Sequence, residues 1–232
     1  MCGYIEVDGE RQQPIMQFPE REIGKQFLSR TFKRYYPAFG QDPNKTIDII
    51  IEEDQQLKQV SATWWFDCTE SNDGLTVGTR TTFNARNLTS PYWQKALKHN
   101  RAIVLATGIG ESKMVGKTKH QYYMQSDEVF VLGALYQKFS NGSYSCAVIT
   151  RDAHPKMQPY HDKAFPGFLP KDDQFLSLWL SKSVQHHPII EETLNHPTLY
   201  PTLKVQRVKT YKDKVAYPSF TPVVLTSDLI NN

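Results

Sequence analysis

The chain has 232 residues, of which 39% are hydrophobic and 22% are charged, with a formal net charge of +3. This length and composition suit one packed domain, residues 1–232, and exclude wholesale disorder. The longest apolar runs, 102–109 and 129–136, fall far short of the ~20 residues that a membrane-spanning helix needs. With no signal peptide apparent, we expect a cytoplasmic protein that does not engage a membrane.

The three cysteines and the basic residues give only weak indications of function. Cys2, Cys68 and Cys146 form neither a disulfide framework nor a zinc pattern, which fits a reducing compartment. Basic residues gather in four short groups that can be solvated surface or can supply phosphate contacts to nucleic acid. These groups are 25–34, 95–101, 113–120 and 204–214.

Periodicity predicts the following elements in chain order: a helix at 21–35, strands at 46–52, 62–67 and 76–84, a helix at 90–100, strands at 102–107, 121–124, 129–139 and 143–150, and helices at 172–183 and 189–194. Ser90 before Pro91 is typical of a capped helix start. The Asn141-Gly142 pair indicates a hairpin. Many consecutive strands with few helices favour an α+β domain of mainly antiparallel strands, in a curved sheet or open barrel with flanking helices.

Cys2 is the first candidate for chemistry. If Met1 is removed, an α-amino group (pKa about 7.7–8.0) stands beside a thiol (pKa about 8.5), so both nucleophiles are partly available near neutral pH. Such a 1,2-aminothiol forms an imine with an aldehyde and then closes a thiazolidine ring. By position alone, Cys2 can equally be a residue that happens to follow the initiator methionine.

Five motifs in order resemble one known family. They are MCG at the start, FNARNLT at 83–89, RAIVLATGIGE at 101–111, GALY at 133–136 and PYHDKAFP at 159–166. Together they resemble the SOS-response-associated peptidase (SRAP) family of abasic-site processing proteins. No single motif is specific, but the ordered set is, and it spans most of the chain.

The resemblance implies a reacting core of Cys2, Asn84, Glu111 and His161. In such a family Asn84 holds the N-terminal cysteine and the reacting sugar. Glu111 follows an apolar run, so partial burial would suit it to proton transfer around the amine. His161 would donate a proton that opens the abasic deoxyribose and exposes its aldehyde.

The resemblance also implies DNA contacts. Arg86 matches a phosphate-binding arginine, and Thr150 matches a position near the site. Trp64 resembles a tryptophan that stacks near DNA, although Trp65 could align with that family position equally well. A tryptophan buried in the core is an equally good interpretation. Without the resemblance, Asn84-Ala85-Arg86 would be read as a turn at a strand end.

The chain departs from the family at several peripheral positions. Tyr4 stands where the family has arginine, Gln94 where the second helix should carry arginine, and Ser112 where tryptophan should follow the glutamate. The H-x-R-M-P motif has become HDKAFP, with one residue added. Tyr4 and Lys163 are candidates for replacing the lost DNA contacts.

Two other patterns carry no function. Residues 110–118 resemble a P-loop, but five residues rather than four separate Gly110 from Gly116. The histidines near Pro188 are explained by a short helix start, so we expect neither a metal nor another cofactor.

The sequence therefore predicts a monomeric enzyme that captures abasic sites in single-stranded DNA as a thiazolidine crosslink through Cys2, with possible lyase and self-processing peptidase-type activity. Single-stranded DNA is favoured because an unpaired lesion reaches a pocket without an unstacking cost. Two alternatives stay open: an N-terminal-nucleophile cysteine hydrolase with His161 or Glu111 as base, and a non-catalytic binding module.

Overall fold

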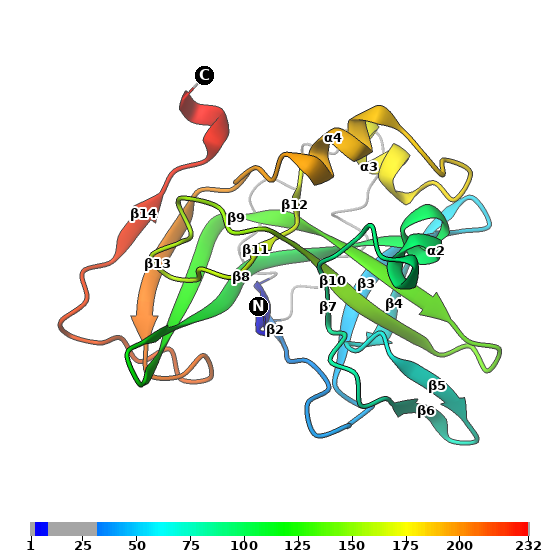
Figure 1. The fold of residues 1–232 in the computed structure, drawn as a ribbon, viewed down its shortest axis with the longest axis horizontal. Helices are drawn as coiled ribbons and strands as arrows, with labels where there is room; N and C mark the ends of the chain where they lie inside the picture. Colours follow the sequence, from blue (N-terminus) through cyan, green and yellow to red (C-terminus); the bar gives the residue numbers. More distant parts are fainter. Residues whose placement is uncertain (1–2, 9–31, 232) are drawn as a thin grey trace.

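The computed structural model, which describes residues 3–8 and 32–231, is built on one large sheet with helices on one of its faces (Figure 1). Strands dominate, and the sheet curls without closing into a barrel. The predicted α+β class, with mainly antiparallel strands and flanking helices, is confirmed. In the described part of the chain, no helix is both long enough and apolar enough to span a bilayer.

The sheet runs in the order β14-β13-β9-β10-β4-β3-β8-β1-β2, and β9 pairs with β8 as well, which bends the sheet back on itself. β7, β11 and β12 add short pairings to β10 and β9, while β5 and β6 form a separate hairpin. The strands are β1 (Ile5–Asp8), β2 (Phe32–Tyr35), β3 (Thr46–Glu53), β4 (Gln56–Thr63), β5 (Cys68–Ser71), β6 (Gly74–Val77), β7 (Asn84–Ala85), β8 (Arg101–Val115), β9 (Thr118–Lys138), β10 (Tyr144–Arg151), β11 (Phe165–Pro166), β12 (Phe168–Leu169), β13 (Leu203–Val208) and β14 (Val223–Leu225).

β8 and β9 form the longest pairing, and it contains an irregularity that decides which way β8 side chains point. Before it, Val104 and Ala106 face the apolar core on the side away from the helices. The register then shifts between Ala106 and Gly108. After the shift an odd-numbered residue, Ile109, faces that same core. Because side chains alternate along a strand, the shift also turns Glu111 to the core side.

The helices cover the other face of the sheet (Figure 1). They are α2 (Pro91–His99), α3 (Asp173–Leu180) and α4 (Pro188–Asn195), followed near the C-terminus by the 3-10 turn η2 (Asp228–Asn231). Ser90 caps α2 and Asp172 caps α3 through their side-chain oxygens. These caps satisfy backbone N–H groups that the first helical turn leaves unpaired.

Arg101 ties two of these helices to β8. Its guanidinium is 4% exposed and donates to six backbone carbonyls. The acceptors are the carbonyl oxygens of Leu97, Lys98, Leu178, Trp179, Ser181 and Val184. Burial lowers the pKa of Arg101 to about 10, so it remains charged at neutral pH. A fixed cation is favourable here because the carbonyl ends of α2 and α3 carry partial negative charge.

Several predicted elements are confirmed, and others are wrong in part. The strands predicted separately at 121–124 and 129–139 belong to one strand, β9. Residues 32–35 of the predicted first helix form β2, paired along β1; residues 21–31 lie outside the described residues. The strand predicted at 62–67 ends at Thr63, because the Trp65 N–H turns back to the Thr63 carbonyl. The strand predicted at 76–84 is interrupted by a loop that Asp67 anchors through Gly78 and Thr82.

We expect Arg101→Met to lower the free energy of unfolding by about 3 kcal/mol, because buried carbonyls at two helix ends lose a charged donor. Urea denaturation followed by tryptophan fluorescence measures the change. Lys95→Met, an exposed position on α2, is the matched control and should stay within about 0.5 kcal/mol of the wild type. Equal stability of the two variants would contradict the role given to Arg101.

We expect Gly110→Ala to lower the free energy of unfolding by about 2 kcal/mol through overpacking. A Cβ at this position would lie 2.8 Å from a ring carbon of Tyr211 and 2.9 Å from the Cβ of Tyr4. In a Tyr211→Ala background the same change should cost less, because one of the two contacts is gone. A double-mutant cycle by urea denaturation tests this, and identical costs in both backgrounds would refute it.

Candidate active site

Glu111 and His161 form a buried acid–base pair. The Nδ1 of His161 lies 3.5 Å from a carboxylate oxygen of Glu111, and the two side chains are 6% and 1% exposed. Glu111 comes from β8 just beyond the register shift, and His161 from the turn that precedes β11. Two residues fifty positions apart, both predicted to be catalytic, are thus in direct contact.

The turn that carries His161 is held against β8 by three consecutive strand residues. The His161 N–H closes a helical turn on the Met157 carbonyl, and its ring Nδ1 is 2.7 Å from the Ser112 carbonyl. Lys113 donates from Nζ to the Gln158 carbonyl at 2.6 Å. The position of His161 is therefore fixed by the same strand segment that carries Glu111.

The Ser112 carbonyl also determines which ring nitrogen of His161 carries the proton. A carbonyl only accepts hydrogen bonds, so Nδ1 at 2.7 Å must be the donor in the neutral ring. The other nitrogen, Nε2, is then the basic one. His161 can accept a proton at Nε2 and return it from there without releasing Ser112.

Asn84, Thr150 and Arg86 gather at one end of β10. Asn84 is paired with Val148 in a parallel bridge, which brings Thr150 beside the segment that continues to Arg86. Thr150 is 1% exposed, and no hydrogen-bond partner for its hydroxyl lies within residues 3–8 and 32–231. Thr150 also pairs with Pro166, five residues after His161. The shared strand connects these three residues to the turn of His161.

Arg86 and Lys163 are both at the surface. The Arg86 guanidinium is half exposed and makes one ion pair with Asp152, which is itself 91% exposed. An exposed pair of this kind contributes little to stability and is readily exchanged for another anion. Lys163 is exposed two residues after His161. Both cations are accessible to a phosphate group.

Tyr4 and Trp64, predicted to contact DNA, are fully buried. Tyr4 donates its hydroxyl to Glu6 and stacks on Tyr211. The indole N–H of Trp64 donates to the Phe83 carbonyl, and the alternative Trp65 is only 5% exposed. No base can stack on either indole without opening this packing, so the burial favours the interpretation of Trp64 as a core residue.

A basic and aromatic groove of about 550 Å³ lies beside Tyr4. Lys33, Arg34 and Lys45 line it, together with Tyr36 and Phe39, whose side chains are 37% and 50% exposed. Lys33 is paired with Asp48 and Lys45 donates to the Phe39 carbonyl, while Arg34 is 3.9 Å from the Glu6 carboxylate. Tyr36 packs edge-on against Tyr4, with ring centroids 5.2 Å apart. Cations interleaved with open aromatic rings suit a single nucleic acid strand.

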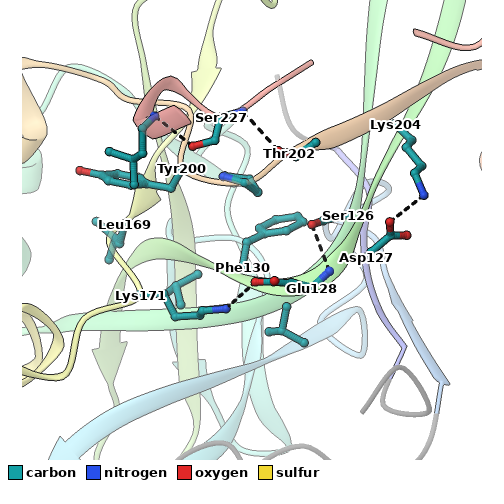
Figure 2. A pocket seen from close by; sticks show the side chains of 14 residues that line it. Ser126, Asp127, Glu128, Phe130, Leu169, Lys171, Tyr200, Thr202, Lys204 and Ser227 are labelled. Atoms are coloured by element: carbon teal, nitrogen blue, oxygen red, sulfur yellow. Dashed lines mark hydrogen bonds and ion pairs between the residues drawn. The ribbon is translucent and has the colours of Figure 1, made fainter. Parts of the chain in front are cut away.

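Another cavity, of about 560 Å³, is lined by residues 126–131 of β9 together with Leu169, Tyr200 and Ser227, and it contains none of the predicted site residues (Figure 2). Its charged groups are already paired, Lys171 with Glu128 at 2.9 Å and Lys204 with Asp127 at 2.6 Å. The paired charges leave this cavity without a net attraction for an anion such as DNA.

Cys2 lies outside the described residues. The chain near it is described from Gly3, and the carbonyl of Tyr4 accepts a hydrogen bond from the Gly110 N–H at 2.9 Å. The residue next along β8 is Glu111. The N-terminal strand therefore runs alongside the strand that carries the predicted carboxylate.

The sequence analysis missed a set of residues around Tyr4, namely Glu6, Tyr123, Tyr211 and Lys214. Glu6 is 3% exposed, accepts from Tyr4 and Tyr123, and pairs with Lys214. The signal available in the sequence was the position of Glu6 between Ile5 and Val7, because a carboxylate buried among apolar residues requires charged or hydrogen-bonding partners.

Comparisons with known proteins identify a family and a fold for the chain. The family model described as SOS response associated peptidase (SRAP) matches residues 1–215. A crystal structure of a Bacteroides thetaiotaomicron protein has a TM-score of 0.62 at 18% identity, covering 90% of this chain and 93% of that one. A phage-related protein from Bordetella bronchiseptica has a TM-score of 0.63 at 16% identity, covering 93% and 100%. These two likenesses show a shared fold.

A search of curated proteins found no match. The family model, however, covers most of the chain and includes the positions of Asn84, Glu111 and His161. Its description associates its members with the SOS response, the bacterial response to DNA damage. The chain belongs to the SOS response associated peptidase (SRAP) family.

Proposed function

We propose that this protein captures abasic sites in single-stranded DNA by a covalent bond to Cys2. The contact between Glu111 and His161, beside the N-terminal strand, is the observation that carries the proposal. Cys2 is two residues from Tyr4, so its Cα lies within about 7.6 Å of the Tyr4 Cα. Because Tyr4 is paired with Gly110, the neighbour of Glu111, this connectivity supports a role for Cys2 beside the acid–base pair.

The chemistry requires hydrolysis of the Met1–Cys2 bond, which exposes the amine. The Cys2 nitrogen attacks the aldehyde carbon of the ring-opened deoxyribose, and loss of water gives an imine. The Cys2 sulfur then bonds to the imine carbon, and the thiol proton passes to the nitrogen, closing a thiazolidine. Atoms and electrons balance without an oxidant or reductant. The imine is also the species from which strand cleavage, a lyase reaction, would start.

His161 and Glu111 divide the proton transfers. Nε2 of His161 is the basic nitrogen, so it is suited to moving a proton to and from the sugar ring oxygen. Glu111 is suited to accepting a hydrogen bond from the Cys2 amine and to helping water leave. The buried hydroxyl of Thr150 and the amide of Asn84, at the end of β10, provide hydrogen-bonding groups for the sugar.

The surrounding cations support a nucleic acid strand as the substrate. Arg86 and Lys163 are accessible at the β10 end, and the groove beside Tyr4 offers Arg34 with the exposed rings of Tyr36 and Phe39. Phosphate contacts supply affinity without sequence preference, and aromatic stacking accepts any base. Such a surface suits a lesion in any sequence context.

The test is incubation of the purified protein with a single-stranded oligonucleotide carrying one abasic site, read by intact mass and denaturing gel. We expect loss of Met1 and a stable adduct of the wild type. Cys2→Ala should give no stable adduct, although borohydride should still trap its imine, because the amine remains. His161→Gln should slow adduct formation by about 100-fold.

Lys95→Met, at an exposed position on α2, is the control and should react as the wild type does. A wild-type protein that has lost Met1 but forms no adduct with the oligonucleotide would refute the proposal. Adduct formation by Cys2→Ala as fast and as stable as that of the wild type would refute the role of the thiol. Cleavage of peptide substrates without any adduct would instead indicate the hydrolase alternative.

A further inference from the structure

A buried carboxylate joins the N-terminal strand to the far end of the chain. Glu6, on β1, is 3% exposed and accepts hydrogen bonds from the hydroxyls of Tyr4 at 2.5 Å and Tyr123 at 2.6 Å. The Lys214 ammonium forms an ion pair with the same carboxylate, and Arg34 lies 3.9 Å from it. We call Tyr4, Glu6, Tyr123, Tyr211 and Lys214 the tyrosine–glutamate cluster.

Aromatic contacts surround the ion pair. The ring of Tyr211 stacks on Tyr4 with centroids 5.3 Å apart and an angle of 21° between the planes. The Lys214 ammonium lies 4.5 Å from the ring centroid of Tyr123 and 5.0 Å from that of Phe32. Each charge in the cluster thus has both an opposite charge and polarisable rings beside it, as a desolvated ion pair requires.

The segment that supplies Tyr211 and Lys214 is a tight loop after β13. The Lys209 N–H bonds to the Val215 carbonyl and the Lys214 N–H to the Thr210 carbonyl, which closes the loop on itself. Lys214 has a φ of 52°, a left-handed conformation that is unfavourable for a residue other than glycine. The loop therefore holds Lys214 in a strained conformation that aims its side chain at Glu6.

The cluster and the acid–base pair occupy opposite faces of the same short stretch of β8. The side chain of Tyr123 lies over Gly108, where a Cβ would come within 2.6 Å of its hydroxyl oxygen. Tyr211 and Tyr4 lie over Gly110, where a Cβ would come within 2.8 Å of a Tyr211 ring carbon and 2.9 Å of the Tyr4 Cβ. Glu111, the next residue along β8, points the other way, to His161. The start of β1 is thus fixed against β8 one residue from the reactive carboxylate.

We propose that the tyrosine–glutamate cluster positions Cys2 for reaction, with Lys214 and Tyr211 of the C-terminal loop acting on the N-terminal aminothiol through Tyr4 and Glu6. This inference rests on the proposed function. Tyr4 lies two residues from Cys2 along the chain, and both its backbone and its side chain are held in place. Position 4, an arginine in the family pattern, thereby serves alignment rather than phosphate binding.

The charges of the cluster argue against a direct role in DNA binding. Lys214 and Glu6 neutralise each other, and the Tyr4 hydroxyl is buried and already donates to Glu6. Burial, together with the hydrogen bond to Glu6, raises the pKa of Tyr4 far above its usual value, so it stays a neutral donor. Loss of the cluster should therefore change the rate of reaction and leave DNA affinity nearly unchanged.

Lys214→Met and Tyr4→Phe test the inference through the dependence of the crosslinking rate on the concentration of abasic single-stranded DNA. We expect Lys214→Met to lower the rate at saturation by roughly 10- to 100-fold, because a small misplacement of a reacting group is costly. The half-saturating concentration should stay within about twofold. Lys214→Arg should recover much of the rate. Lys212→Met, at an exposed lysine of the same loop, should behave as the wild type.

A probe without DNA separates this inference from the proposed function. 2-Cyanobenzothiazole condenses with N-terminal aminothiols, so its rate reports the environment of Cys2 directly. We expect Lys214→Met and Tyr4→Phe to change that rate, while urea denaturation shows that both variants fold. A wild type that never crosslinks abasic DNA overturns the proposed function. If the wild type forms the crosslink and both variants behave like it in both assays, the positioning role is overturned. A variant whose only change is weaker DNA binding overturns it too.

Discussion

The register shift between Ala106 and Gly108 is the constraint on which the site depends. A strand alternates strictly, so an unbroken β8 would turn Glu111 to the helix side, with Ile103 and Leu105. The shift moves Ile109 and Glu111 to the other face, where the turn of His161 lies. One local irregularity thus brings the carboxylate of β8 to the histidine of the candidate site, and bulges are typical near functional sites.

The two ends of β8 place opposite charges in different kinds of environment. At its start, Arg101 is enclosed by carbonyls at the ends of α2 and α3 and fixes the helix layer. Near its end, Glu111 is enclosed beside a histidine. Helix dipoles satisfy the first charge permanently, because their carbonyls do not titrate. Glu111 instead faces the imidazole of His161, a group that can both donate and accept a proton, as the proposed chemistry requires.

Local patterns in the sequence encode the element ends and turns that could be predicted. Ser90 marked the start of α2, and Asn141-Gly142 marked the turn between β9 and β10. These patterns did not predict β2, because residues 32–35 become a strand only by pairing with β1. The family resemblance assigned Glu111 and His161 to one site, and the two side chains are in contact. Local patterns could not decide between a core Trp64 and a DNA-stacking one, because its burial depends on contacts with residues distant in sequence such as Phe83. Long-range packing decides such cases over local propensity.

The tyrosine at position 4, where the family pattern has arginine, is explained by the residues that Tyr4 contacts. An arginine in this enclosed position would compete with Lys214 for Glu6 and bring a second cation beside a single carboxylate. The tyrosine instead donates a neutral hydrogen bond, packs its Cβ against Gly110, and leaves Lys214 as the counter-ion. Glu6, Lys214 and Gly110 therefore act with Tyr4 as a set, because each removes a cost that the others would otherwise create. Restoring arginine at position 4 alone would unbalance the buried charge before it gained any contact with DNA.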